Sequence, residues 1–168
     1  MNVEVFVEIC REGVALPVYA KHGDAGMDVM AAEEVLIAAG QTVLIPTGLR
    51  FAIPEGFEIQ VRPRSGISLR TPLRISNSPG TIDSGYRDEL AIIMTNTSNK
   101  LLSINDDNFC YFTLDDKNNQ MGDYLIKKGD RIAQIVLKQV PVMKLTLTTS
   151  VSAIGSDRGG GFGSTGVK

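Results

Sequence analysis

Apolar and polar residues alternate with a period of two along much of this 168-residue chain. Such alternation, in runs rich in β-branched and aromatic residues, is typical of half-buried β-strands. It marks seven segments, namely VEVFVEI (3–9), TVLIPTGL (42–49), FEIQVR (57–62), ELAIIMT (89–95), YLIKKG (124–129), RIAQIVL (131–137) and KLTLTTS (144–150). Turn signals rich in Gly and Pro separate them at the spacing of a β-sandwich or barrel. The pattern predicts an all-β protein, with one short helical turn at most in GISLRTPL (66–73).

Two segments interrupt this rhythm. Residues 98–123 mix Asn and Asp clusters with a short aromatic run, which predicts an extra hairpin or a long excursion. Residues 156–168 are rich in glycine and lack apolar periodicity, so we expect a flexible tail. The predicted organisation is therefore one barrel domain over 1–155, with an insertion at about 98–123 and a mobile C-terminal segment.

Composition narrows the function classes. A formal net charge of −2 argues against stable binding to nucleic acid or to an anionic membrane surface, which needs a surplus of Lys and Arg. No stretch is long and apolar enough to span a membrane. The first ten residues lack the basic start and apolar core of a signal peptide, so we expect a cytoplasmic protein. Cys10 and Cys110 are expected to be buried free thiols, and with His22 as the single histidine they cannot form a four-ligand zinc site.

Several short motifs carry candidate chemistry, each with a plainer alternative. RPRSG (62–66) offers guanidinium and hydroxyl donors to an anion, although arginines near a turn are more often a solvated surface. RGGGFGSTG (158–166) could form a phosphate clamp with an aromatic lid, or remain a flexible tail. Asp83, in SNSPGTIDSGYRDEL (76–90), and Asp28, in AGMDVMA (25–31), could be turn formers. Gln134, in KGDRIAQIVL (128–137), could point to solvent.

These five motifs, taken in order along the chain, resemble the five sequence motifs of the homotrimeric dUTPases. The resemblance runs from Ala25 to Gly166. It implies a jelly-roll-like β-barrel of the β-clip type, assembled as a homotrimer whose active sites are shared between subunits. It also gives the glycine-rich tail a role, because in that family the tail crosses to a neighbouring subunit and closes its site as a lid.

The resemblance also implies individual roles. Asp83 matches the aspartate that orients and activates the water attacking the α-phosphorus, and Gln134 matches a residue that binds phosphate and helps to hold this water. Mg²⁺ is expected on the triphosphate, with Asp28 contacting its water ligands and not the ion directly. Substrate binding is implied for Arg64, Ser65, Gly66, Asn77, Gly80, Thr81, Ile82, Tyr86, Arg158, Phe162, Gly163, Ser164 and Thr165.

The implied reaction is Mg²⁺-dependent hydrolysis of dUTP to dUMP and pyrophosphate, which limits uracil incorporation into DNA and supplies dUMP for dTMP synthesis. Two alternatives remain: a dCTP deaminase-like enzyme of the same fold, and a nucleotide-sensing binding module that acts through the inserted segment. Three features depart from the family pattern. Asp88 replaces a common glycine, the spacing from Arg158 to Phe162 is one residue short, and the insertion lengthens the connection between the third and fourth motifs.

Overall fold

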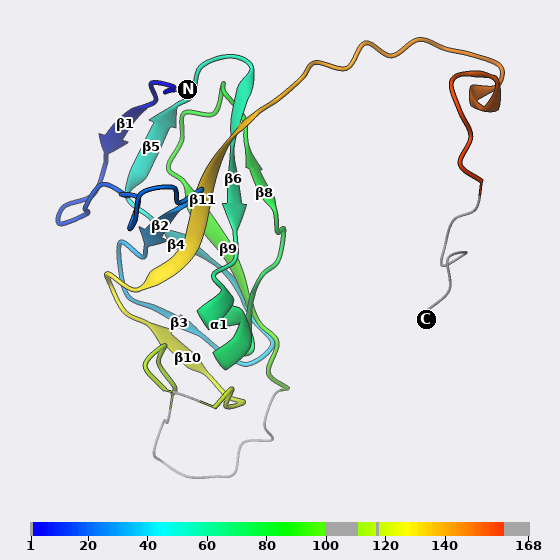
Figure 1. The fold of residues 1–168 in the computed structure, drawn as a ribbon. Coiled ribbons are helices and arrows are strands. Elements are labelled where there is room, and N and C mark those ends of the chain that lie inside the picture. Colours follow the sequence, from blue (N-terminus) through cyan, green and yellow to red (C-terminus); the bar gives the residue numbers. More distant parts are fainter. Residues whose placement is uncertain (1, 100–110, 117, 160–168) are drawn as a thin grey trace.

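The computed structural model describes residues 2–99, 111–116 and 118–159 (Figure 1). These residues form eleven strands and two short helices. The elements are β1 (Phe6–Ile9), β2 (Met27–Met30), β3 (Val35–Ile37), β4 (Thr42–Pro46), β5 (Leu49–Ala52), β6 (Phe57–Arg62), α1 (Ser65–Arg70), β7 (Leu73–Ile75), β8 (Gly80–Ile82), β9 (Ala91–Asn96), β10 (Tyr124–Ile126), β11 (Arg131–Gln139) and the 3₁₀ helix η1 (Val151–Ala153).

The strands pair antiparallel in four small sheets, which confirms the predicted all-β class. The largest sheet has the order β2-β11-β6-β8, a second has the order β4-β9-β7, and β1-β5 and β10-β3 form two-stranded pairs. Neighbours in these sheets are mostly distant in sequence, so the sheets tie the ends of the barrel domain to its middle.

Alternation along the central strands builds the core. In β9 every second residue is buried, and in β6 Ile59 and Val61 are buried while their neighbours are partly exposed. Together with Ile92 and Met94 of β9 and Ile135 of β11, they belong to one apolar cluster. Burying each such side chain stabilises the fold by roughly 1.5–3 kcal/mol, so this cluster holds the sheets in place.

The predicted strand at 144–150 is wrong. After β11 the chain leaves the barrel as an extended arm, which Figure 1 shows in orange. The Val140 N–H donates to the Gly56 carbonyl oxygen at 2.8 Å, but further along Leu145 and Leu147 are 88% and 100% exposed. Strand propensity alone does not make a strand, because a strand also needs a partner with free backbone groups.

The helix α1 is somewhat longer than the single turn expected. It covers six residues and begins one residue before the predicted segment. It ends at Arg70, and the next residue, Thr71, caps it: the Thr71 N–H and hydroxyl both donate to the Ile67 carbonyl oxygen, at 3.0 and 2.8 Å. The Leu73 N–H donates to the same hydroxyl at 3.1 Å, so Thr71 turns the chain directly into β7.

The barrel holds both ends of the predicted insertion. At its start, the Ser98 hydroxyl accepts the Gly122 N–H at 3.0 Å, and near its end Asp123 accepts the Ala39 N–H at 2.8 Å. The Phe112 ring packs on Tyr124 with a centroid separation of 5.7 Å. The described parts of the segment are thus attached to the β3-β10 end of the barrel, while the division of the chain into 1–155 and 156–168 stays a prediction.

Two further expectations concern single features. Cys10 is a free thiol but is only half-buried, and Cys110 lies outside the described residues. Neither helical segment in the described part of the chain has the length and apolar character that crossing a membrane requires.

Asn96 generates a prediction about stability. Its fully buried amide donates to the carbonyl oxygens of Ile37 and Gly122, at 3.0 and 2.7 Å, and accepts the Ser98 N–H at 3.0 Å. Asn96→Ala should leave these backbone groups unpaired and lower the free energy of unfolding by about 2–3 kcal/mol, measured by urea denaturation. Asn99→Ala, at an exposed neighbouring position, is the matched control and should change little. Equal effects of the two variants would contradict this role.

Candidate active site

One end of the four-stranded sheet gathers polar side chains from three adjacent strands. Gln134 of β11 pairs with Asp28 of β2 on one side and with Arg62 of β6 on the other. Directly opposed residues project from the same face of a sheet, so these three side chains are neighbours. A cavity of about 560 Å³ opens over them and is also lined by Arg131. Gln134 is half-buried there, so its side chain faces the cavity rather than a flat solvated strand surface.

Asp28 is the electrostatic centre of this group, which we call the arginine rim (Asp28, Arg62, Arg64, Arg131 and Gln134). Its Oδ1 accepts from Arg64 Nε at 2.9 Å, and its Oδ2 lies 3.6 Å from Arg131 Nη1. Arg64 Nη1 also donates to the Arg131 carbonyl oxygen at 3.1 Å. The carboxylate is only 23% exposed, so these ion pairs are less screened than surface pairs.

The arginine rim carries more positive than negative charge, which suits a polyanion. The rim contains three arginines and one carboxylate; Arg64 and Arg131 pair with Asp28, whereas Arg62 donates to Gln60 Oε1 at 3.2 and 2.6 Å. Ser65 and Gly66 follow Arg64 in the exposed first turn of α1. A Cβ placed on Gly66 would meet no atom within 4 Å, so packing in this chain does not demand glycine there. The bare backbone instead leaves amide groups accessible to an anion.

The rim fits a metal ion only indirectly. Among the described residues, no group of three or more His, Cys, Asp or Glu side chains is arranged to hold a metal. Both Asp28 oxygens already face guanidinium groups. This set fits Mg²⁺ that arrives on phosphate oxygens and keeps several water ligands, and the contact of Asp28 through water stays a prediction.

The second predicted group lies on residues 76–83, which we call the β8 segment. β8 is the last strand of its sheet, so one side of the Thr81 and Ile82 backbone has no strand partner in the described structure. A Cβ at Gly80 would lie 3.2 Å from Asn77 Nδ2, so glycine lets the Asn77 amide approach the strand closely. The β8 segment thus presents backbone and amide groups at the open edge of β8, where a planar ligand with hydrogen-bonding groups can pair with them.

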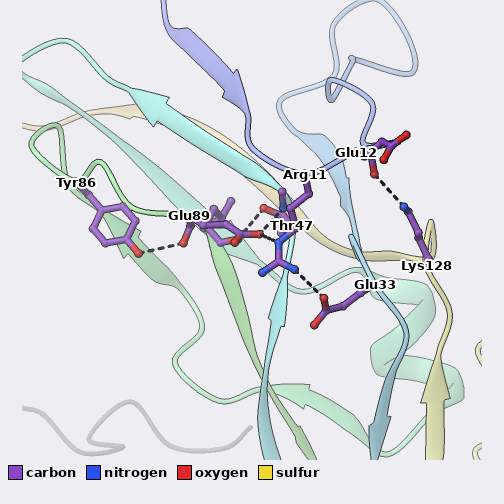
Figure 2. A network of polar contacts seen from close by, with 9 residues as sticks. Arg11, Glu12, Glu33, Thr47, Tyr86, Glu89 and Lys128 are labelled. Carbon is purple, nitrogen blue, oxygen red and sulfur yellow. Dashed lines mark hydrogen bonds and ion pairs between the residues drawn. The ribbon is translucent and has the colours of Figure 1, made fainter.

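Asp83 and Tyr86 follow β8 directly. Asp83 is exposed, and its carbonyl oxygen accepts the Tyr86 N–H at 3.1 Å. The Tyr86 hydroxyl donates to the Glu89 carbonyl oxygen at 3.1 Å, as Figure 2 shows. Asp88, the departure from the family glycine, is exposed in the same loop. The tyrosine ring therefore spans the loop that carries the carboxylate.

Glu89 fastens this loop to the barrel. Its Oε1 accepts from Arg11 Nε and from the Gly48 N–H, both at 2.7 Å, and Arg11 Nη1 also pairs with Glu33 at 2.7 Å (Figure 2). Partial burial acts to raise the pKa of Glu89. The hydrogen bonds from Arg11 and Gly48, with the charges of Arg11 and Arg50, outweigh burial and hold this pKa below 4.5, its ordinary value.

Asp83 lies apart from the arginine rim within one chain. Ile82 is opposite Ile59 of β6, whereas Gln134 is opposite Arg62. Asp83, one residue past Ile82, is thus displaced from the arginine rim by about four residues, or about 13 Å along the strands. Arg158 is exposed on the C-terminal arm, and Phe162, Gly163, Ser164 and Thr165 lie outside the described residues. The structure brings together Asp28, Arg64 and Gln134, but not Asp83.

The structure adds residues that sequence reasoning missed. Arg131 stands in the same quoted motif as Gln134, and its position three residues earlier was the available signal. Glu89 likewise stands in the motif of Asp83. Arg11 carries no sequence signal, because its partner Glu89 is 78 residues away.

Comparisons with known proteins agree with this geometry. The dUTPase family model matches residues 12–108. The deoxyuridine 5'-triphosphate nucleotidohydrolase of Clostridium acetobutylicum is 40% identical over 167 residues, covering 99% of each chain. The enzyme of the same name from Clostridium kluyveri is 39% identical over 166 residues, covering 98% of this chain and 99% of the relative.

Solved structures show the same fold. A Staphylococcus bacteriophage 80alpha dUTPase variant with dUpNHpp superposes with a TM-score of 0.84 at 28% identity, covering 98% of this chain and 99% of that one. A dUTPase variant from phage phi11 of S. aureus, described with a structural Mg(II) ion, gives 0.73 at 27% identity, covering 88% and 98%. The barrel is therefore of the jelly-roll-like β-clip class. The chain belongs to the dUTPase family.

The lowered pKa of Glu89 predicts a pH effect on stability. The unfolded state takes up the proton first as the pH falls, so the stability contributed by ionised Glu89 is present above pH 4.5 and is lost as the pH drops through the lower folded pKa. Near pH 7, Glu89→Gln should lower the free energy of unfolding by about 1 kcal/mol. This difference should shrink below pH 4.5, as measured by urea denaturation across the range.

Glu33→Gln is the control for this measurement, since Glu33 pairs with Arg11 from a position that is 53% exposed. It should have a smaller effect at neutral pH. A gap between wild type and Glu89→Gln that does not change with pH would contradict the assignment.

Proposed function

We propose that this protein hydrolyses dUTP to dUMP and pyrophosphate in a Mg²⁺-dependent reaction. The observation that carries the proposal is that a chain of the dUTPase family presents both an open strand edge next to Asp83 and an arginine-rich rim beside Gln134. In the cytoplasm such an activity limits uracil incorporation into DNA and supplies dUMP for dTMP synthesis.

The open edge of β8 suits the uracil ring. Uracil offers an N–H donor between two carbonyl acceptors, and cytosine replaces the donor and one acceptor by groups of opposite character. Backbone groups of Thr81 and Ile82, with the Asn77 amide, can match only one of these patterns. A mismatch would leave buried polar groups unpaired, which is costly, so cytosine is refused. Tyr86 follows on the sugar side, where its ring packs beneath the deoxyribose.

The rim holds the phosphates. Arg64, Ser65 and Gln134 bind phosphate oxygens, and Asp28 would hold Mg²⁺ through its water ligands. When bound, this ion neutralises charge on the triphosphate. Asp83 accepts a hydrogen bond from the attacking water and aims it at the α-phosphorus, opposite the departing pyrophosphate. Since a carboxylate is a weak base at neutral pH, positioning and charge neutralisation supply most of the acceleration.

A complete site requires more than one subunit. The displacement of Asp83 from the arginine rim within one chain supports a homotrimer in which the β8 segment of one subunit lies against the rim of another. The apolar arm after β11 supports the same assembly, because Val142, Leu145 and Leu147 are at least 88% exposed in a single chain. Such side chains need cover from a neighbour. The C-terminal tail closes a neighbouring site over the phosphates and the base. The residues proposed for this role are Arg158, Phe162, Gly163, Ser164 and Thr165.

A second candidate function uses the inserted segment. Its described parts are fastened to the barrel by Ser98, Phe112 and Asp123, so it could present a surface to a partner and report nucleotide binding. A similar solved structure, the dUTPase of phage phi11 of S. aureus, is described with a species-specific insert. Tight dUTP binding without hydrolysis would favour such a binding module over the enzyme.

The substrate prediction uses pyrophosphate release. With Mg²⁺ present, dUTP should be hydrolysed far faster than dCTP, dTTP or UTP. Cytosine mismatches the hydrogen-bonding groups at the open edge of β8, thymine adds a methyl group to the ring, and ribose adds a 2'-hydroxyl next to Tyr86. Asp83→Asn should still bind dUTP but should lower kcat by at least about a hundredfold. Comparable turnover of all four nucleotides would contradict the specificity argument, and ammonia release from dCTP would instead indicate a deaminase.

The shared site predicts complementation between inactive variants. Asp83→Asn inactivates the β8 segment of each chain that carries it, whereas Gln134→Ala inactivates the arginine rim of its chain. After unfolding and refolding together at equal amounts, random trimers should contain about a quarter of sites with both parts intact, and activity should return to about that fraction of wild type. The two variants refolded separately are the control. A mixture that stays inactive would mean that each site is built within one chain.

A further inference from the structure

The loop that carries Asp83 and Tyr86 has few anchors of its own. Hydrogen bonds from its first residues are local: the Tyr86 N–H reaches Asp83, and Arg87 Nη1 donates to the carbonyl oxygens of Ser84 and Tyr86, at 2.6 and 2.9 Å. Tyr86 itself is 40% exposed. Packing therefore covers the ring only in part, and the hydrogen bond of its hydroxyl contributes to its position.

The hydroxyl is held by a peptide group that the barrel fixes firmly. Tyr86 donates to the Glu89 carbonyl oxygen. The next residue, Leu90, is buried; its N–H donates to the Leu49 carbonyl oxygen at 2.8 Å, and its own carbonyl oxygen accepts from the Thr47 N–H and hydroxyl, at 3.1 and 2.7 Å. On the other side, the Glu89 carboxylate holds Arg11 and the Gly48 N–H.

Only glycine suits the backbone conformation that lets the Gly48 N–H donate to Glu89. The Gly48 φ of +71° lies in the left-handed region that side chains rarely adopt, and a Cβ there would lie 2.5 Å from Val14 Cγ2. The turn between β4 and β5 thus directs the Gly48 N–H toward Glu89, and it has no room for a side chain at position 48. Arg11 completes the arrangement from the segment after β1, with Glu33 behind it (Figure 2).

We propose that Arg11 and Glu89, which we call the strut, position the Tyr86 ring and thereby set the discrimination between deoxyribose and ribose nucleotides. The proposal rests on the proposed function, in which this ring lies beneath the sugar. Glu89 and Arg11 touch no substrate in it; they are positioning residues that act through Tyr86. A ribose 2'-hydroxyl is excluded by shape, and such exclusion is sensitive to small displacements of the excluding group.

The experiment compares kcat/KM for dUTP and for UTP in variants of the full-length protein, with urea denaturation in parallel. Glu89→Ala should lower the ratio of the two values by about tenfold, because the strut and the Gly48 partner are both lost. Glu89→Gln keeps an acceptor for the Gly48 N–H but loses the charge opposite Arg11, so the ratio should fall by only about threefold. Arg11→Ala should resemble Glu89→Gln.

Coupling between the two residues provides a second measurement. If they act as one unit, Arg11→Ala combined with Glu89→Gln should be no less selective than either single variant. Lys127→Ala is the control, since it removes a more exposed ion pair, with Asp115 at 3.3 Å, that includes no residue of the strut or of the Tyr86 loop. It should leave the ratio unchanged.

The outcomes separate the strut from the proposed function. Wild-type protein that does not prefer dUTP to UTP would overturn both. Selective wild-type protein, with Glu89→Ala and Arg11→Ala that lose activity toward dUTP and UTP in equal proportion, would overturn the strut alone and reduce Glu89 to a structural residue. If Glu89→Ala does not fold, Arg11→Ala and Glu89→Gln decide the question, because both keep the Gly48 N–H paired.

Discussion

The pairing of β11 with both β2 and β6 is the constraint on which the rest of this structure depends. It sets Gln134 between Asp28 and Arg62 and so assembles the arginine rim from segments that are more than thirty residues apart. A slip of one residue would turn Gln134 toward the core and expose Ile135 instead. The buried residues of β11 resist such a slip, so packing of the core fixes the geometry of the rim.

The same sheet also sets Asp83 away from the rim. β8 runs antiparallel to β6, with Gly80 opposite Val61 and Ile82 opposite Ile59, so Asp83 follows β8 at the end that points away from Arg62. A single chain thus presents Asp83 and the arginine rim as separate groups, each with an open side. The open edge of β8 and the apolar arm are liabilities for an isolated monomer, and the proposed trimer would turn both into contacts.

Electrostatics gives the rim a resting arrangement. Asp28 neutralises part of the charge of Arg64 and Arg131, which holds these long side chains in place before any anion arrives. Under the proposed function, a triphosphate would compete with Asp28 for Arg64, and a cation that accompanies the phosphates would compensate the released carboxylate.

The sequence by itself determined the class of the fold, most of the longer strands and the residue types of the site. Period-two alternation is a local property, and the five motifs carry their chemistry in contiguous residues. Only the tertiary structure decided that 144–150 is no strand in this chain, that Gln134 faces a cavity, and that Asp83 lies apart from it. It alone found Arg11 as the partner of Glu89. The physical reason is that register, exposure and ion pairing depend on which distant segments meet, and a one-dimensional pattern holds no information on the partner.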